Sequence, residues 1–170
     1  MKLLLRVLYV GFLFVVVAVC ISVSRPISLS EDNMNTVRSS FCSFGNGDWS
    51  ALSDLYTPGY LQHLPDFNDP VTFKAYFSSC YLVHSRVPDL QIRIVDIFAA
   101  LDKVAVRSVW EYRSDSDQFK VYYPSGIAQG SCISIYRVEN GLIAEEWSEY
   151  DSALIVEFCR IHMSIWPYEE

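Results

Sequence analysis

Glycine is scarce in this sequence of 170 residues, with only seven in total, and the short motifs that mark common enzyme classes are missing. There is no Gly-rich phosphate-binding loop, dinucleotide-binding fingerprint, HExxH pair or nucleophile-elbow motif. The cysteines form no CxxC pair and no cluster with histidine. A zinc site is therefore not expected.

Positive charge is scarce as well, because 13 Lys and Arg face 20 Asp and Glu, for a formal net charge of −7. An acidic surface is unsuited to nucleic acid or anionic lipid, so neither is an expected partner. About half of the residues are apolar, and no low-complexity tract follows residue 30. The chain is long enough for one buried core and too short for two ordinary domains, which predicts a single domain.

The N-terminus differs from the rest of the chain. Lys2 and Arg6 precede an apolar run from Val7 to Ile21, and small residues follow up to Ser24. This order is typical of a signal peptide, here residues 1–24, and predicts a secreted or lumenal protein.

An uncleaved anchor formed by residues 7–23 is the alternative, because the apolar run approaches the roughly 20 residues that span a bilayer. The membrane is a partner only in that case. Cleavage changes the formal charge to −9, since the leader contains two basic residues and no acid. Residues 25–30 are expected to form a linker.

Four cysteines remain after cleavage: Cys42, Cys80, Cys132 and Cys159. In an oxidising compartment an even number permits one or two disulfides, whose pairing the sequence leaves open. The alternative is that they are small buried thiols on helix and strand faces, since free cysteine is among the most buried residue types.

Helical spacing of apolar residues predicts three helices in the first half of the chain. The first begins after Ser30 and stops at Gly45–Gly47. Asp48 caps a short second helix, which Thr57–Gly59 ends. A third extends from about Pro70 to His84.

The second half alternates with a period of two, which predicts strands. They cover residues 90–100, 104–113, 119–123, 127–138 and 142–150, after a short extended piece at 60–63. Asn140-Gly141 between two such runs specifies a tight hairpin. Residues 151–166 have helical spacing again. The order predicts an α+β domain over residues 31–166, with a curved antiparallel sheet and helices on one face around a cavity.

Four stretches of this sequence carry a resemblance to a known family: Asn46–Trp49, Tyr60–His63, Asp102–Arg107 after Pro88–Leu90, and Ile133–Trp147. In this order they resemble the SnoaL-like polyketide cyclases of the nuclear transport factor 2-like superfamily. The resemblance implies a cone-shaped sheet that, with three N-terminal helices and a C-terminal helix, encloses a pocket, often in a homodimer. It also implies cyclase, isomerase, hydrolase or purely binding roles.

In the cyclases of this family an acid follows the tryptophan of the last strand, and a polar side chain on the neighbouring strand helps to bind substrate. The matching positions here are Ser148, after Trp147, and Ser134. A hydroxyl without an adjacent base is a poor proton acceptor, so the cyclase mechanism does not transfer unchanged.

His63 and Asp96 are two candidates for the missing acid/base. By the resemblance His63 enters the pocket wall, where imidazole suits proton transfer near neutral pH, although a backbone-bonded loop histidine is the alternative. Asp96 interrupts an apolar strand, so it is either a pocket acid or the ion-pair partner of Arg107, and the ion pair is favoured.

Glu146 is the third candidate, because strand alternation places it on the same face as Ser148. Its alternative is a solvated or ion-paired sheet residue. Trp110 and Tyr136 are candidate ligand contacts, although aromatic strand residues more often pack in the core. The sequence thus predicts a secreted pocket protein that binds a small apolar molecule, with cofactor-free acid/base chemistry, or a non-catalytic binding or dimerisation module.

Overall fold

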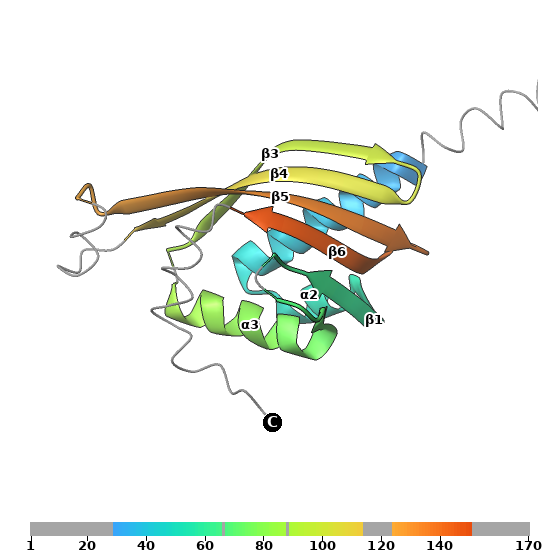
Figure 1. Cartoon of the computed structure of the whole chain (residues 1–170), viewed down its shortest axis with the longest axis horizontal. Helices are drawn as coiled ribbons and strands as arrows, with labels where there is room; N and C mark the ends of the chain where they lie inside the picture. Colours follow the sequence, from blue (N-terminus) through green and yellow to red (C-terminus); the bar gives the residue numbers. More distant parts are fainter. Residues whose placement is uncertain (1–28, 66, 88, 114–123, 151–170) are drawn as a thin grey trace, which may run out of the picture.

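The computed structural model describes residues 29–65, 67–87, 89–113 and 124–150 (Figure 1). Residues 29–46 form a long helix. The later elements are α2 (Trp49–Ser53), β1 (Tyr56–His63), β2 (Val71–Thr72), α3 (Phe73–Arg86), β3 (Gln91–Ala100), β4 (Lys103–Arg113), β5 (Ile127–Glu139) and β6 (Leu142–Tyr150). The predicted strand at 119–123 and the predicted helix at 151–166 lie outside the described residues, as does the leader.

The strands form one six-stranded curved sheet in the order β2-β1-β6-β5-β4-β3. The pairs β3–β4, β4–β5 and β5–β6 are antiparallel, as the alternating pattern predicted. The β5–β6 turn places Asn140 at φ 52° and Gly141 at φ 81°, the left-handed conformation that an Asn-Gly hairpin requires. The predicted α+β class and curved sheet are confirmed. One pairing departs from a purely antiparallel sheet, because β1 runs parallel to β6.

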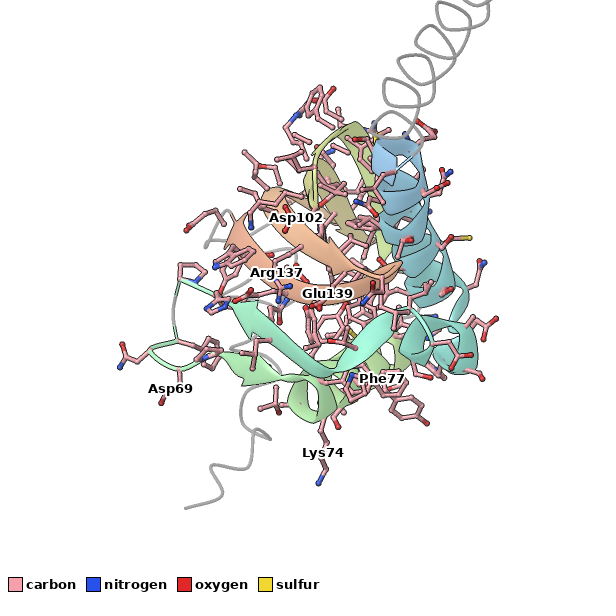
Figure 2. All side chains as sticks on the ribbon, turned by 90° about the vertical axis from the view of Figure 1, so that its right-hand side faces the viewer. Asp69, Lys74, Phe77, Asp102, Arg137 and Glu139 are labelled. Carbon is pink, nitrogen blue, oxygen red and sulfur yellow. The ribbon has the colours of Figure 1, made fainter. Side chains whose placement is uncertain are left out.

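The helices cover one face of this sheet. The 29–46 helix crosses behind β3–β6 in Figure 1, and α3 lies below β1 in Figure 2. The helices and strands pack together through a core of fully buried side chains, which include Val37, Leu52, Val104 and Ile143. Burial of such side chains contributes roughly 1.5–3 kcal/mol each, so this layer fixes the helices against the concave face.

The predicted end of the second helix was wrong. We expected Tyr56 in the helix and a break at Thr57–Gly59, but α2 stops at Ser53 and these residues belong to β1. Tyr56 pairs with Ile143 of β6, and the β1–β6 register shifts before Leu61. Proline and glycine are tolerated at such an irregularity, because no regular ladder bond is needed there.

Candidate functional site

The two faces of β6 carry different chemistry. Its burial alternates along the strand, so that Glu146 and Ser148 are 4% and 5% exposed, whereas Glu145 and Trp147 lie on the outer face. The inner face, which carries Glu146 and Ser148, is the face that the helices cover. The predicted sharing of one face by Glu146 and Ser148 is therefore confirmed.

Two hydroxyl groups hold the Glu146 carboxylate from opposite sides. The Tyr60 hydroxyl donates to Oε2 at 2.6 Å, and the Ser148 hydroxyl donates to Oε1 at 2.6 Å. Tyr60 comes from β1 and is 1% exposed, so the parallel pairing of β1 with β6 brings this donor to the acid. Hydrogen bonds of this length to an ionised acceptor are among the strong ones in proteins.

The hydrogen bonds continue from β6 to β5. Ser134 lies opposite Ser148 in the ladder, with 2.7 Å between the hydroxyl oxygens, and Cys132 Sγ lies 3.4 Å from Ser134 Oγ. Because Ser148 gives its single proton to Glu146, Ser134 must donate to Ser148, and the Cys132 thiol to Ser134. We call Tyr60, Cys132, Ser134, Glu146 and Ser148 the acid–hydroxyl cluster.

Tyrosine rings surround this cluster on the helix side. The ring centroids of Tyr56 and Tyr60 are 4.8 Å apart, and those of Tyr60 and Tyr76 are 5.1 Å apart. The Tyr56 and Tyr76 hydroxyls are hydrogen-bonded at 3.0 Å. Tyr136 pairs with Glu146 across the β5–β6 ladder and packs edge-on against Phe41 of the 29–46 helix. The carboxylate therefore lies in aromatic, water-poor surroundings.

The charge of Glu146 affects its neighbours. Burial and, after it, the negative charge of Glu146 raise the pKa of Tyr60 and Tyr136 well above the ordinary value. Tyr56 shows the same direction for the same two reasons. Burial also raises the pKa of the Cys80 thiol to about 12. These groups keep their protons at neutral pH, so they can donate hydrogen bonds but cannot act as bases.

Within the described ranges no cation contacts Glu146, whose hydrogen-bond partners there are the hydroxyls of Tyr60 and Ser148. Burying a carboxylate without a positive partner is costly, and a hydrogen bond from each side offsets only part of that cost. Groups that are kept in such an environment are candidates for acid/base chemistry.

His63 lies on the opposite face of the sheet. Its Nε2 is 2.9 Å from Glu145 Oε1, and its ring stacks on Trp147 at 5.3 Å and 6°. Lys103 Nζ lies 4.3 Å from the centre of the same indole. Glu145 also accepts from Arg137 at 3.0 Å, and Figure 2 labels Arg137 beside Glu139, its second partner.

The structure therefore separates His63 from Glu146, which we expected in one pocket. The reason is alternation along β1: Tyr60 faces inward, so His63, three residues later, faces outward. The sequence did not reveal which face of this short piece was buried.

Asp96 also lies outside the cluster. Its Oδ2 is 2.7 Å from Arg107, and both side chains are nearly half exposed. The β3–β4 register shifts between Ile94 and Asp96, so the core-facing positions change from Ile92 and Ile94 to Ile97. This irregularity turns Asp96 to the outer face, in the ion pair that the sequence favoured.

The remaining candidates lie on the inner face. Ser134 and Ser148 are members of the cluster, and Tyr136 is buried beside it. Trp110 donates its indole N–H to Ser108 at 3.0 Å and lies 6.2 Å from the Phe44 ring. Sequence reasoning missed Tyr60, because its contact with Glu146 depends on a strand pairing distant in sequence, and it also missed Cys132, which contacts Ser134 on its own strand. The spacing of two residues between Cys132 and Ser134 could have indicated that both side chains lie on the same face of the strand.

The described part of the chain contains three cysteines. Cys42 is exposed, Cys80 and Cys132 are buried, and all three are free thiols, while Cys159 lies outside the described ranges. No group of three or more potential ligands in those ranges is arranged to hold a metal ion. None of the helices described is long and apolar enough to cross a membrane.

Comparison with known proteins places the chain in a family. The model for SnoaL-like polyketide cyclases matches residues 36–157, so the chain belongs to this family. Its fold is that of a pocket protein. Comparison with curated proteins gave no match.

Solved structures share the fold. IdmH from Streptomyces antibioticus, a proposed polyketide cyclase, is 24% identical with a TM-score of 0.62, covering 74% of this chain and 96% of its own. A proposed SnoaL-like polyketide cyclase from a Jannaschia species is 20% identical, with a TM-score of 0.61 and coverages of 81% and 95%. A proposed ketosteroid isomerase from Kribbella flavida is 15% identical, with a TM-score of 0.55 and coverages of 72% and 79%.

Proposed function

We propose that this domain binds a small apolar carbonyl compound between the concave sheet and the helices, and that Glu146 acts on it as a cofactor-free acid/base. The observation that carries the proposal is the buried carboxylate that only hydroxyl groups contact in the described part of the chain. The solved structures that share the fold include proposed cyclases and a proposed isomerase, which supports this reaction class.

The chemistry begins with proton abstraction next to a carbonyl group. Glu146 takes the proton, and the electron pair of the broken C–H bond passes to the carbonyl oxygen to give an enolate. Return of the same proton to another carbon is an isomerisation. Attack of the enolate carbon on a second carbonyl carbon closes a ring instead, and the alkoxide that forms as the C=O π bond breaks takes the proton back from Glu146. The raised pKa of Tyr60 keeps its hydroxyl protonated, so this hydroxyl donates a hydrogen bond that holds the Glu146 carboxylate in position before proton transfer.

The acid of this site lies two residues before the position that the family resemblance indicated. Ser148 occupies that position and donates to Glu146 instead of acting as the acid. Because residues two apart on a strand share a face, Glu146 lies on the same side of the sheet as Ser148, at the preceding inward-facing position of β6.

A deuterium-exchange assay tests this proposal. The probes are two apolar carbonyl compounds, 2-tetralone and ethyl 2-oxocyclohexanecarboxylate, in deuterium oxide, with α-proton loss followed by NMR. We expect the wild-type domain to accelerate exchange, Glu146→Gln to abolish the acceleration, and His63→Gln, on the outer face, to retain it. Loss of exchange in His63→Gln together with full exchange in Glu146→Gln would contradict the assignment.

A non-catalytic binding module is the rival. It predicts that apolar ketones raise the melting temperature of the wild type and of Glu146→Gln equally, without any exchange. That pair of results would replace the catalytic proposal with plain binding.

We also propose that the domain forms a homodimer through the outer face of the sheet. The register places Ala105, Ile135, Trp147 and His63 in one row across four strands. Ile133 and Ile135 of β5 are 54% and 41% exposed on this face, an apolar surface that a second copy would cover. Ile135→Asp is expected to convert a dimer to a monomer in analytical ultracentrifugation. A wild type that sediments as a monomer at 100 μM would contradict the dimer.

From the N-terminal sequence we also propose that the protein is exported from the cytosol. It is then either secreted or lumenal, or held at the membrane. The mass of the mature protein from expressing cells distinguishes cleavage after Ser24 from retention of the leader.

A further inference from the structure

One end of the domain presents exposed apolar side chains from two elements. Leu29 begins the described helix and is 54% exposed, while Phe98 and Leu101, near the β3–β4 turn, are 66% and 77% exposed. The Asn33 side-chain amide donates to the Leu101 carbonyl at 3.0 Å, which fixes the first turn of the helix against that strand turn. Figure 1 shows the start of the helix beside the tip of β3 and β4. We call Leu29, Phe98 and Leu101 the apolar end.

Leu101 has an unfavourable backbone conformation for its residue type. Its φ is 57°, in the left-handed region that glycine and asparagine enter far more readily than leucine. The neighbouring β5–β6 turn uses Asn140 and Gly141 for the same purpose, and Val138 N to Asp102 O at 2.7 Å joins the two turns. Because the Leu101 side chain is exposed, burial in the core does not offset this backbone strain, whereas a contact outside the domain would offset it.

The position of this end relative to the leader identifies the contact. The apolar run ends at Ile21, and seven residues separate it from Leu29. The eight residue steps from Ile21 to Leu29 span at most about 29 Å, so an anchored apolar run keeps Leu29 within that distance of the bilayer surface. The apolar end is then the part of the domain nearest the lipid.

We propose that residues 7–23 are retained as an anchor and that the apolar end rests in the interface of the bilayer. Asp102 and Glu31 are exposed at the same end, and their negative charges would repel anionic headgroups, so the contact suits zwitterionic lipid better than anionic lipid. This orientation holds the domain in a fixed pose on the membrane, where apolar ligands collect.

The test uses the full chain in phosphatidylcholine vesicles, with a nitroxide label at position 101 or 125 after Cys20, Cys42 and Cys159 are changed to Ser. Ser125 is the matched control, because it is exposed and lies just before Ile127, which pairs with Arg113 at the opposite end of β4 from Lys103. We expect collision of a water-soluble nickel chelate to be at least threefold lower at position 101 than at 125, and oxygen collision to be higher.

A second variant separates membrane contact from folding. Leu101→Asn suits the left-handed conformation, so the melting temperature should stay the same or rise. With the label moved to position 98, the same change should reduce protection from nickel at least twofold. A stable Leu101→Asn chain with unchanged protection would contradict the proposal.

Three results would overturn it directly. The first is equal nickel collision at positions 101 and 125. The second is protection at 101 without any rise in collision when the nickel is carried on a chelating headgroup lipid in the same vesicles, because then the chain and not the bilayer covers the apolar end. The third is a mature protein that lacks residues 1–24, which removes the anchor.

Discussion

Glu145 and Glu146 are neighbours in sequence, carry the same side chain and occupy opposite environments. Glu145 lies on the outer face and accepts hydrogen bonds from His63 and Arg137. Glu146 lies on the inner face, where two hydroxyls contact it and four tyrosine rings lie nearby. A single step along β6 thus separates an ion-paired surface acid from a buried one.

Their effects on ionisation differ accordingly. Desolvation alone would raise the pKa of Glu145, but the hydrogen bonds from His63 and Arg137 outweigh it and lower that pKa. Glu146 instead raises the pKa of Tyr60 and Tyr136, after burial itself. On the outer face the Glu145 carboxylate joins side chains of neighbouring strands, whereas on the inner face Glu146 is buried with hydroxyl groups as its hydrogen-bond partners in the described residues.

The largest expected contrast concerns packing on the two faces. Ile143→Ala removes a fully buried side chain of β6 and should lower the free energy of unfolding by about 3 kcal/mol, since a cavity remains. Ile133→Ala, on the outer face and 54% exposed, should cost under about 0.5 kcal/mol. Urea unfolding at low protein concentration measures both. Equal losses would mean that the outer face is covered within one chain.

The next contrast concerns the hydroxyl that holds Glu146. Tyr60→Phe leaves the ring in place but removes a buried donor, so unfolding free energy should fall by about 2 kcal/mol. Tyr81→Phe is the control, because Tyr81 is 54% exposed, and it should change stability by less than about 0.5 kcal/mol. If Tyr60→Phe were as stable as the control, the hydrogen bond to Glu146 would contribute nothing to folding.

The smallest contrast is the pH dependence of the outer acid. Because the pKa of Glu145 is lower in the folded state, its stabilising contribution is present above the unfolded pKa and is lost as pH falls through the folded one. Glu145→Gln should therefore cost up to about 1 kcal/mol at pH 7 and close to nothing near pH 3. Thermal unfolding between these pH values measures the difference. A constant difference at all pH values would contradict the ion-paired role.

Local sequence signals predicted the part of this fold that rests on neighbouring residues. Asn140-Gly141 gave the hairpin, and alternation along β6 placed Glu146 and Ser148 on one face. The errors had two causes. The face of His63 depends on β1 lying parallel to β6, about 80 residues away, whereas the face of Asp96 depends on a register shift in the β3–β4 pair that no residue type marks. The sequence therefore did not indicate Tyr60, although its hydroxyl contacts Glu146.

The most direct test of this account compares the two adjacent glutamates in the same exchange assay. Glu146→Gln should lower α-proton exchange of the apolar carbonyl probes by at least about 100-fold, the usual contribution of a positioned acid/base. Glu145→Gln should change it by less than about twofold, since that carboxylate faces away from the inner side. Equal losses in both variants, or exchange that survives in Glu146→Gln, would contradict the central claim that the buried acid of β6 carries the chemistry.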